Sequence, residues 1–165
     1  REALVVGCGL GHDAEDLALR GWRVTAFDLS PTAIEWAVRL HPESRVDYVV
    51  ADAAHPPAEW KGRFDLIHEI HTLQTLPDDL RERVCEAICF CLGPDGALLV
   101  GCRGRDEGDY PRTMPMPLPK SALDLFVELG LQEVTFQDFV EESEGDGTRR
   151  FQAIYFKPSA YSVSF

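Results

Sequence analysis

The sequence has no long apolar run and no excess of basic residues. No apolar stretch approaches the roughly 20 residues that span a bilayer, and no signal peptide is apparent after Arg1. Lys and Arg number 16 against 28 Asp and Glu, which gives a net charge of −12. Because such a charge repels phosphate backbones and anionic lipid surfaces, we expect neither a nucleic-acid nor a membrane partner.

Cysteine is sparse and shows no disulfide or metal-binding pattern. Five cysteines, an odd number, lie in apolar surroundings, whereas a secreted disulfide framework is usually even. Cys85, Cys89 and Cys91 are close in sequence, but no C-x-x-C pair or Cys/His partner at zinc spacing accompanies them. We therefore expect buried thiols, no metal and a cytoplasmic location.

The length and composition are those of one ordinary globular domain. The 165 residues are 45% hydrophobic and 27% charged, close to the average for soluble domains. We expect one domain over residues 1–158 and a tail over residues 159–165. The sequence leaves the oligomeric state open.

Apolar runs of strand type alternate with helical patterns along the chain. The runs cover residues 3–6, 24–27, 46–50, 66–70 and 97–100, and the helical patterns cover residues 12–19, 33–40, 78–92 and 120–129. This order predicts an α/β fold with a doubly wound, Rossmann-like, mostly parallel sheet and helices on both faces. Alternating patterns at residues 133–141 and 150–157 predict a C-terminal antiparallel hairpin across a turn at residues 144–147.

A glycine-rich loop follows the first predicted strand. Gly7, Gly9 and Gly11 allow a tight turn and let a ligand approach the backbone. Asp28 ends the second strand, 21 residues after Gly7, where a carboxylate can accept both hydroxyls of a ribose. Asp52 and Ala53 end the third strand, in a position suited to an adenine edge. The pattern predicts a nucleoside-containing ligand.

The residues after the loop distinguish between two such ligands. A pyrophosphate-binding loop needs a third glycine at position 12, but the chain has His12, followed by the acids Asp13 and Glu15. Those acids oppose a phosphate and suit a cationic ligand end, with an amino group and a sulfonium. S-adenosylmethionine (SAM) is such a ligand. An NAD-binding domain of an oxidoreductase is the less favoured alternative.

Residues 4–100 resemble class I SAM-dependent methyltransferases, and especially their thiopurine S-methyltransferase-like, small-molecule branch. The matching segments are VVGCGLGHDAEDLALRGWRVTAFDLSPTAIEWA, VVADA, FDLIHEIHTLQTLP and LGPDGALLV. The resemblance implies a methyltransferase domain with SAM as cofactor, S-adenosyl-L-homocysteine (SAH) as product and a small-molecule substrate. The cofactor-binding residues that it implies are Gly7, Cys8, Gly9, Gly11, Asp13, Asp28, Leu29, Asp52, Ala53 and Glu69.

Two features depart from the usual family pattern. Val5 stands where many class I enzymes have an acid two positions before the first glycine, although the thiopurine-like branch also lacks that acid. The family usually has a helical cover before the first strand, and we expect the natural gene product to extend upstream of Arg1. Loss of that cover favours a second alternative, a non-catalytic SAM-binding or scaffolding module.

The predicted substrate face follows the fourth and fifth strands. Glu69 and His71 follow the apolar start of the fourth strand, and Arg103 and Arg105 follow the fifth, so we expect them to converge near the transferable methyl. The candidate catalytic residues are Glu69 or His71 as proton acceptor and Arg105 as a contact for a polar or anionic acceptor, such as a thiol. The proline-rich loop over residues 106–119 is expected to form a substrate lid.

Overall fold

The computed structural model describes residues 1–110, 115–142 and 147–159, and these residues contain one seven-stranded sheet. The strands are β1 (Glu2–Val6), β2 (Arg23–Asp28), β3 (Asp47–Val50), β4 (Phe64–Ile70), β5 (Leu92–Arg103), β6 (Gln132–Glu141) and β7 (Thr148–Phe156). They lie in the order β3-β2-β1-β4-β5-β7-β6. The first five are parallel, and β7 runs antiparallel between β5 and β6. This confirms the predicted doubly wound, Rossmann-like fold.

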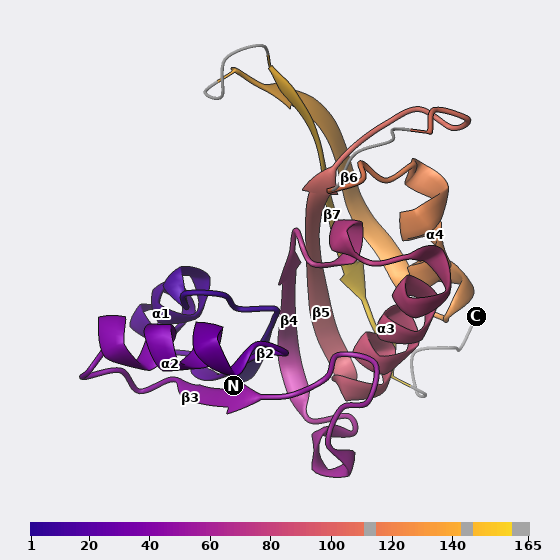
Figure 1. The fold of residues 1–165 in the computed structure, drawn as a ribbon. Coiled ribbons are helices and arrows are strands. Elements are labelled where there is room, and N and C mark those ends of the chain that lie inside the picture. The colour runs from indigo at the N-terminus through magenta and orange to yellow at the C-terminus, as the bar shows by residue number, and fades with distance from the viewer. Residues whose placement is uncertain (111–114, 143–146, 160–165) are drawn as a thin grey trace.

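The helices lie on both faces of the sheet (Figure 1). One face carries α1 (His12–Leu19) and α2 (Pro31–Leu40), and the other carries α3 (Asp78–Cys91) and α4 (Lys120–Glu128). Alternation along β1 explains how one strand serves both layers, because successive side chains point to opposite faces. Val5 packs in a cluster with Ala14 of α1, whereas Val6 packs in the cluster that contains α3 and α4.

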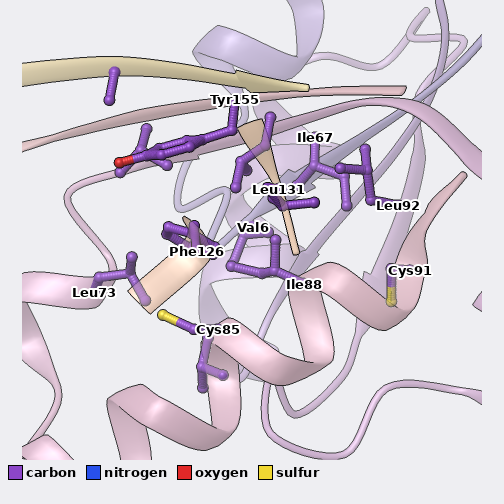
Figure 2. Packing of buried hydrophobic residues seen from close by; sticks show 14 of the residues in the cluster. Val6, Ile67, Leu73, Cys85, Ile88, Cys91, Leu92, Phe126, Leu131 and Tyr155 are labelled. Carbon is purple, nitrogen blue, oxygen red and sulfur yellow. The ribbon is translucent and has the colours of Figure 1, made fainter. Parts of the chain in front are cut away.

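The larger core lies between the sheet and the second helix pair. Cys85, Ile88 and Cys91 of α3 belong to the same buried cluster as Phe126 and Tyr155, and Figure 2 shows these side chains from close by. The five free cysteines are buried or half-buried, as expected for apolar structural thiols. Among the residues that the structure describes, no helix is long and apolar enough to cross a bilayer.

Two local features differ from the sequence expectation. β5 begins at Leu92, directly after α3 ends, whereas the sequence predicts a strand only from residue 97. Gly93 fits this strand for a packing reason: a Cβ at that position would stand 2.9 Å from the carbonyl oxygen of Gly62. Two 3-10 helices, η1 (Ala58–Trp60) and η2 (Leu73–Thr75), are too short to show a helical period and were not predicted.

The predicted C-terminal hairpin is present as β6 and β7, with a register shift between Glu133 and Thr135. Residues 144–146 of the predicted turn, residues 160–165 of the predicted tail and residues 111–114 of the predicted lid lie outside the described residues. Strand order reverses at β1, which pairs with β2 on one side and β4 on the other. Ligands of open α/β sheets bind outside the carboxyl ends of the strands at such a point.

Candidate functional site

A cavity of about 380 Å³ opens at this carboxyl edge. It is lined after β1 by Gly7, after β2 by Asp28 and Leu29, after β3 by Asp52 and Ala53, and after β4 by His71. Six of the predicted site residues therefore meet in one cavity, although they span 65 positions of the sequence. Its inner wall is largely apolar, with Phe27, Ile70 and Leu76 among the lining residues.

The three glycines of the loop differ in how much space surrounds them. All three have positive φ, a conformation that L side chains adopt at a cost. A Cβ on Gly7 would stand 2.2 Å from Thr72 Oγ1, and one on Gly11 would stand 2.2 Å from the Tyr48 hydroxyl oxygen. A Cβ on Gly9 would meet no atom within 4 Å. The first and third glycines thus allow close packing, and the middle one leaves open space.

Asp28 holds the glycine loop at the edge of the cavity. Its Oδ2 accepts the backbone N–H of Gly9 at 3.0 Å, and its Oδ1 accepts that of Ser30 at 2.9 Å. Each carboxylate oxygen has a second lone-pair direction, so both can still accept hydroxyl groups. The side chain can therefore order the loop and bind a diol at the same time.

Asp52 is tied down locally. Its Oδ1 accepts the N–H of Ala54 at 2.9 Å, and its Oδ2 lies 2.8 Å from His55 Nδ1. The hydrogen bond with His55 lowers the pKa of this carboxyl group, with a further contribution from the Ala54 N–H. These bonds form a turn that presents Ala53 to the cavity.

The remaining loop candidates are not among the residues that line the cavity. Cys8 is half-buried, and burial together with the charge of Asp28 raises the pKa of its thiol to about 12. Asp13 is exposed in the first turn of α1, which carries no side-chain cap. The thiol of Cys8 therefore stays neutral, and Asp13 places negative charge near the loop.

His71 stands between two cavities. It lines the first cavity and also a second one of about 200 Å³, whose lining includes Gly101, Phe139 and Arg150. Its φ is +69°, and its N–H donates to the Gly101 carbonyl oxygen at 2.8 Å. Burial lowers the pKa of the imidazole, and the charge of Arg150 lowers it further. The ring is therefore neutral at neutral pH and can accept a proton.

Glu69 is fully buried and does not line the first cavity. Its Oε1 accepts the N–H groups of Thr72 and Leu73 at 2.8 and 2.9 Å, whereas its Oε2 is buried with no partner. Burial raises the pKa of the carboxyl group to about 7. The carboxyl group holds the turn after β4 through these two N–H groups, and Glu69 itself does not line the cavity.

Arg105 does not lie beside His71, contrary to the expectation from the sequence. Its Nε donates to the Pro117 carbonyl oxygen at 2.9 Å and its Nη1 to that of Asp106 at 3.0 Å, while the guanidinium lies 5.2 Å from the Tyr110 ring centroid. It lines a separate groove with residues of α3 and α4. The charges that act on the His71 ring come from Arg150 of β7 and, to a smaller extent, from Arg103 of β5, and these two arginines pair in register.

Part of the predicted lid, residues 116–118, is hydrogen-bonded to the end of β5 and to η2. Leu118 N–H donates to the Arg103 carbonyl oxygen at 2.8 Å, and Met116 N–H donates to that of Gln74 at 3.1 Å. These bonds fasten residues 116–118 to the end of β5 and to η2. Residues 116–118 are not among the residues that line either of the two cavities beside His71.

Sequence reasoning missed Thr72 and Arg150. Thr72 was detectable in principle, because Gly7 needs a close neighbour to explain its lack of a side chain. Arg150 had no such signal, since only the antiparallel register of β7 brings it to the carboxyl edge. Within the described part of the chain, no three metal-ligating side chains form a cluster that could hold an ion.

Comparison with known proteins agrees with this geometry. A family model described as "Methyltransferase domain" matches residues 3–96. A ubiquinone biosynthesis O-methyltransferase from Xanthomonas campestris pv. campestris is 38% identical over 110 residues, which are 65% of this chain and 45% of that protein. The chain thus spans less than half the length of this curated relative.

Solved structures share the fold at low identity. A SAM-dependent methyltransferase from Methanosarcina mazei superposes with a TM-score of 0.83 at 19% identity, covering 95% of this chain and 92% of that one. A 1,6-didemethyltoxoflavin-N1-methyltransferase from Burkholderia thailandensis, solved with bound 1,6-didemethyltoxoflavin and SAH, superposes with a TM-score of 0.78 at 23% identity, covering 96% of this chain and 71% of that one. The chain belongs to the methyltransferase-domain family and has the class I methyltransferase fold.

Proposed function

We propose that residues 1–158 form a single SAM-dependent methyltransferase domain that acts on a small molecule. The observation that carries this proposal is the open backbone at Gly9, whose N–H is bound by Asp28, a residue that lines the larger cavity. A ligand with a ribose and a chain that passes close to the backbone fits this arrangement. The family match and the fold of the structural neighbours support the same assignment.

The charges of the site fit SAM better than a dinucleotide. Asp13 and Glu15 place carboxylates in the first turn of α1, directly after the loop, where they attract an amino group and a sulfonium and repel a pyrophosphate. His12 occupies the position that a pyrophosphate loop gives to glycine. These residues favour SAM over NAD as the ligand.

In this proposal, different residues around the cavity bind different parts of the cofactor. The Gly9 backbone lies against the methionine end, Asp28 accepts the ribose hydroxyls, and Asp52 and Ala53 meet the adenine. Leu29 adds apolar contact to the bound nucleoside. When bound, SAM would supply an activated methyl group: the acceptor forms a bond to the methyl carbon as the bond from carbon to sulfur breaks, and SAH is the leaving group. Correct placement of two reactants supplies roughly 7–11 kcal/mol of such a barrier.

We assign to His71 the role of taking the proton from the methyl acceptor. It borders both cavities, so an acceptor in the smaller one has its reacting atom near the imidazole and near the larger cavity. A neutral imidazole can take the proton of a hydroxyl group, a step worth about 10²–10⁴-fold. A thiolate or other preformed anion needs no such help.

The acceptor class follows from the smaller cavity. Phe139 and Phe151 contribute aromatic side chains to its lining, and the ion pair of Arg150 with Glu141 at 2.9 Å makes another part of the lining polar. A small polar acceptor with a planar body fits these groups. The ubiquinone biosynthesis relatives favour a hydroxyl as the reacting group, whereas the thiopurine-like resemblance favours a thiol.

A single-turnover assay tests the proposed function. The protein in excess over methyl-labelled SAM is incubated with phenols, thiols, amines and halides, and labelled product and SAH are measured together. We expect transfer to at least one phenol or thiol. Tight SAM binding with no transfer to any acceptor would instead support a non-catalytic SAM-binding module.

A further inference from the structure

Glu69 presents an energetic anomaly next to the proposed cofactor cavity. Its side chain is fully buried, and Oε2 has no hydrogen-bond partner in the described structure. Buried carboxyl oxygens are nearly always satisfied, because leaving one unpaired costs free energy. A residue kept in such a position calls for a role that offsets this cost.

The paired oxygen of Glu69 fixes the turn that forms one wall of the cavity. Oε1 accepts the N–H groups of Thr72 and Leu73, at the start of η2. Thr72 in turn donates through Oγ1 to the Val6 carbonyl oxygen at 3.2 Å and occupies the space that a Cβ on Gly7 would need. One carboxyl group thus connects the end of β4 to the glycine loop.

We propose that Glu69 is a positioning residue whose carboxylate holds the Thr72 turn against the glycine loop, so that cofactor affinity depends on its charge. The inference rests on the proposed SAM site. Glu69 itself does not touch the cofactor, because it lies behind the turn. It acts through the backbone of Thr72, which does line the cavity.

The surroundings of Glu69 set the direction of the pH dependence. Burial raises the pKa of the carboxyl group from an ordinary 4.5 to about 7. The titratable groups that act on it are the thiols of Cys85 from α3 and Cys102 from β5. Burial raises the pKa of both thiols, so they stay neutral, and Arg81 of α3 is the cation that acts on both.

The strength of the hydrogen bonds to Glu69 determines whether cofactor affinity rises or falls with pH. A carboxylate is a stronger acceptor of N–H groups than a neutral carboxylic acid, by roughly a factor of two. As the pH rises through about 7, Glu69 ionises and the turn is held more firmly. Cofactor affinity should therefore rise between about pH 6 and pH 8.

Calorimetric titration of SAM and SAH at about pH 6 and pH 8 tests this, with wild type, Glu69→Gln and Tyr155→Phe. The Gln amide oxygen can accept both N–H groups but does not titrate. Wild-type affinity should rise about fivefold with pH for both ligands, and Glu69→Gln should give a flat profile at the weaker level. Tyr155→Phe removes a buried hydrogen bond to the Leu123 carbonyl oxygen, away from the cavity, and should keep the wild-type profile.

Two results would overturn the positioning role. The first is an unchanged pH profile in Glu69→Gln. The second is a change for SAM alone, because SAH lacks the sulfonium and uses the same wall; that result would show direct attraction of charge. If wild type binds neither ligand at either pH, the proposed function itself fails.

Hydrogen exchange of the Thr72 and Leu73 amides tests the same contact without any ligand. Both amides should be protected in wild type and in Glu69→Gln, and more strongly at the higher pH only in wild type. Exchange at the rate of exposed amides in wild type would show that the carboxyl group does not hold the turn, whatever the cofactor does.

Discussion

Asp28 combines two roles in one carboxylate, and its replacement tests both. Asp28→Ala removes the acceptor for the Gly9 N–H and the proposed acceptor for the ribose hydroxyls. We expect SAM binding to weaken by about 1–3 kcal/mol, measured by calorimetry. Asp65→Ala is the matched control, because that exposed carboxylate accepts the Glu2 N–H at the opposite edge of the sheet. Equal affinity in both variants would show that the ligand does not use Asp28.

His71 combines a strained backbone with a titrating ring. Asn tolerates positive φ better than most residues and does not act as a base, so His71→Asn should fold and bind SAM. For a hydroxyl acceptor, the turnover rate should fall about 10²–10⁴-fold. Because the pKa of His71 is lowered, the wild-type rate should fall only at acid pH, below the ordinary histidine range. An unchanged rate on a verified hydroxyl acceptor would place the proton acceptor elsewhere.

The glycine loop offers a matched pair of substitutions at the scale of the element. Gly9 and Gly62 both have positive φ, and a Cβ on either meets open space. Gly9→Ala and Gly62→Ala should therefore lose a similar free energy of unfolding, about 1–2 kcal/mol, measured by denaturant titration. Only Gly9→Ala should also weaken SAM binding, because its methyl enters the space beside the cavity. Equal SAM affinity in the two variants would argue against close approach of the ligand at Gly9.

The elements that the sequence predicted well are those with a local signal. The helix at His12–Leu19 has its apolar period and a glycine just beyond its end, and Ser30 caps α2 by accepting the Ala33 N–H. The start of β5 was missed because its glycines fit for tertiary reasons, next to the carbonyl oxygen of Gly62. Local patterns do not contain such a neighbour.

The candidate site shows the same difference between residues with a local sequence signal and residues placed by tertiary contacts. Gly7, Asp28 and Asp52 follow strands of one parallel sheet, so sequence order alone brings them to one edge. Arg105 follows β5 as well, but its bond to the Pro117 carbonyl oxygen turns it into another groove. Arg150 reaches His71 through an antiparallel register that no local pattern specifies.

At the scale of the whole molecule, the proposed site lies at one edge of the sheet and adjoins the larger of two cores. The two hydrophobic clusters lie on opposite faces of the sheet, and Phe27 and Val84 of the larger cluster also line the cavity at the carboxyl edge. The net charge of −12 disfavours polyanionic partners and is compatible with a cationic cofactor end. We therefore expect the binding of small ligands to depend mainly on the loops at this edge.

Calorimetric titration of the wild-type protein with SAM, SAH and NAD is the most direct test of the central claim. The acids beside the glycine loop and the lack of a third glycine at position 12 should exclude a pyrophosphate. We predict saturable binding of SAM and SAH with one site per chain, and no detectable binding of NAD under the same conditions. Binding of NAD in preference to SAM and SAH would contradict the assignment of this edge as a methyl-donor site.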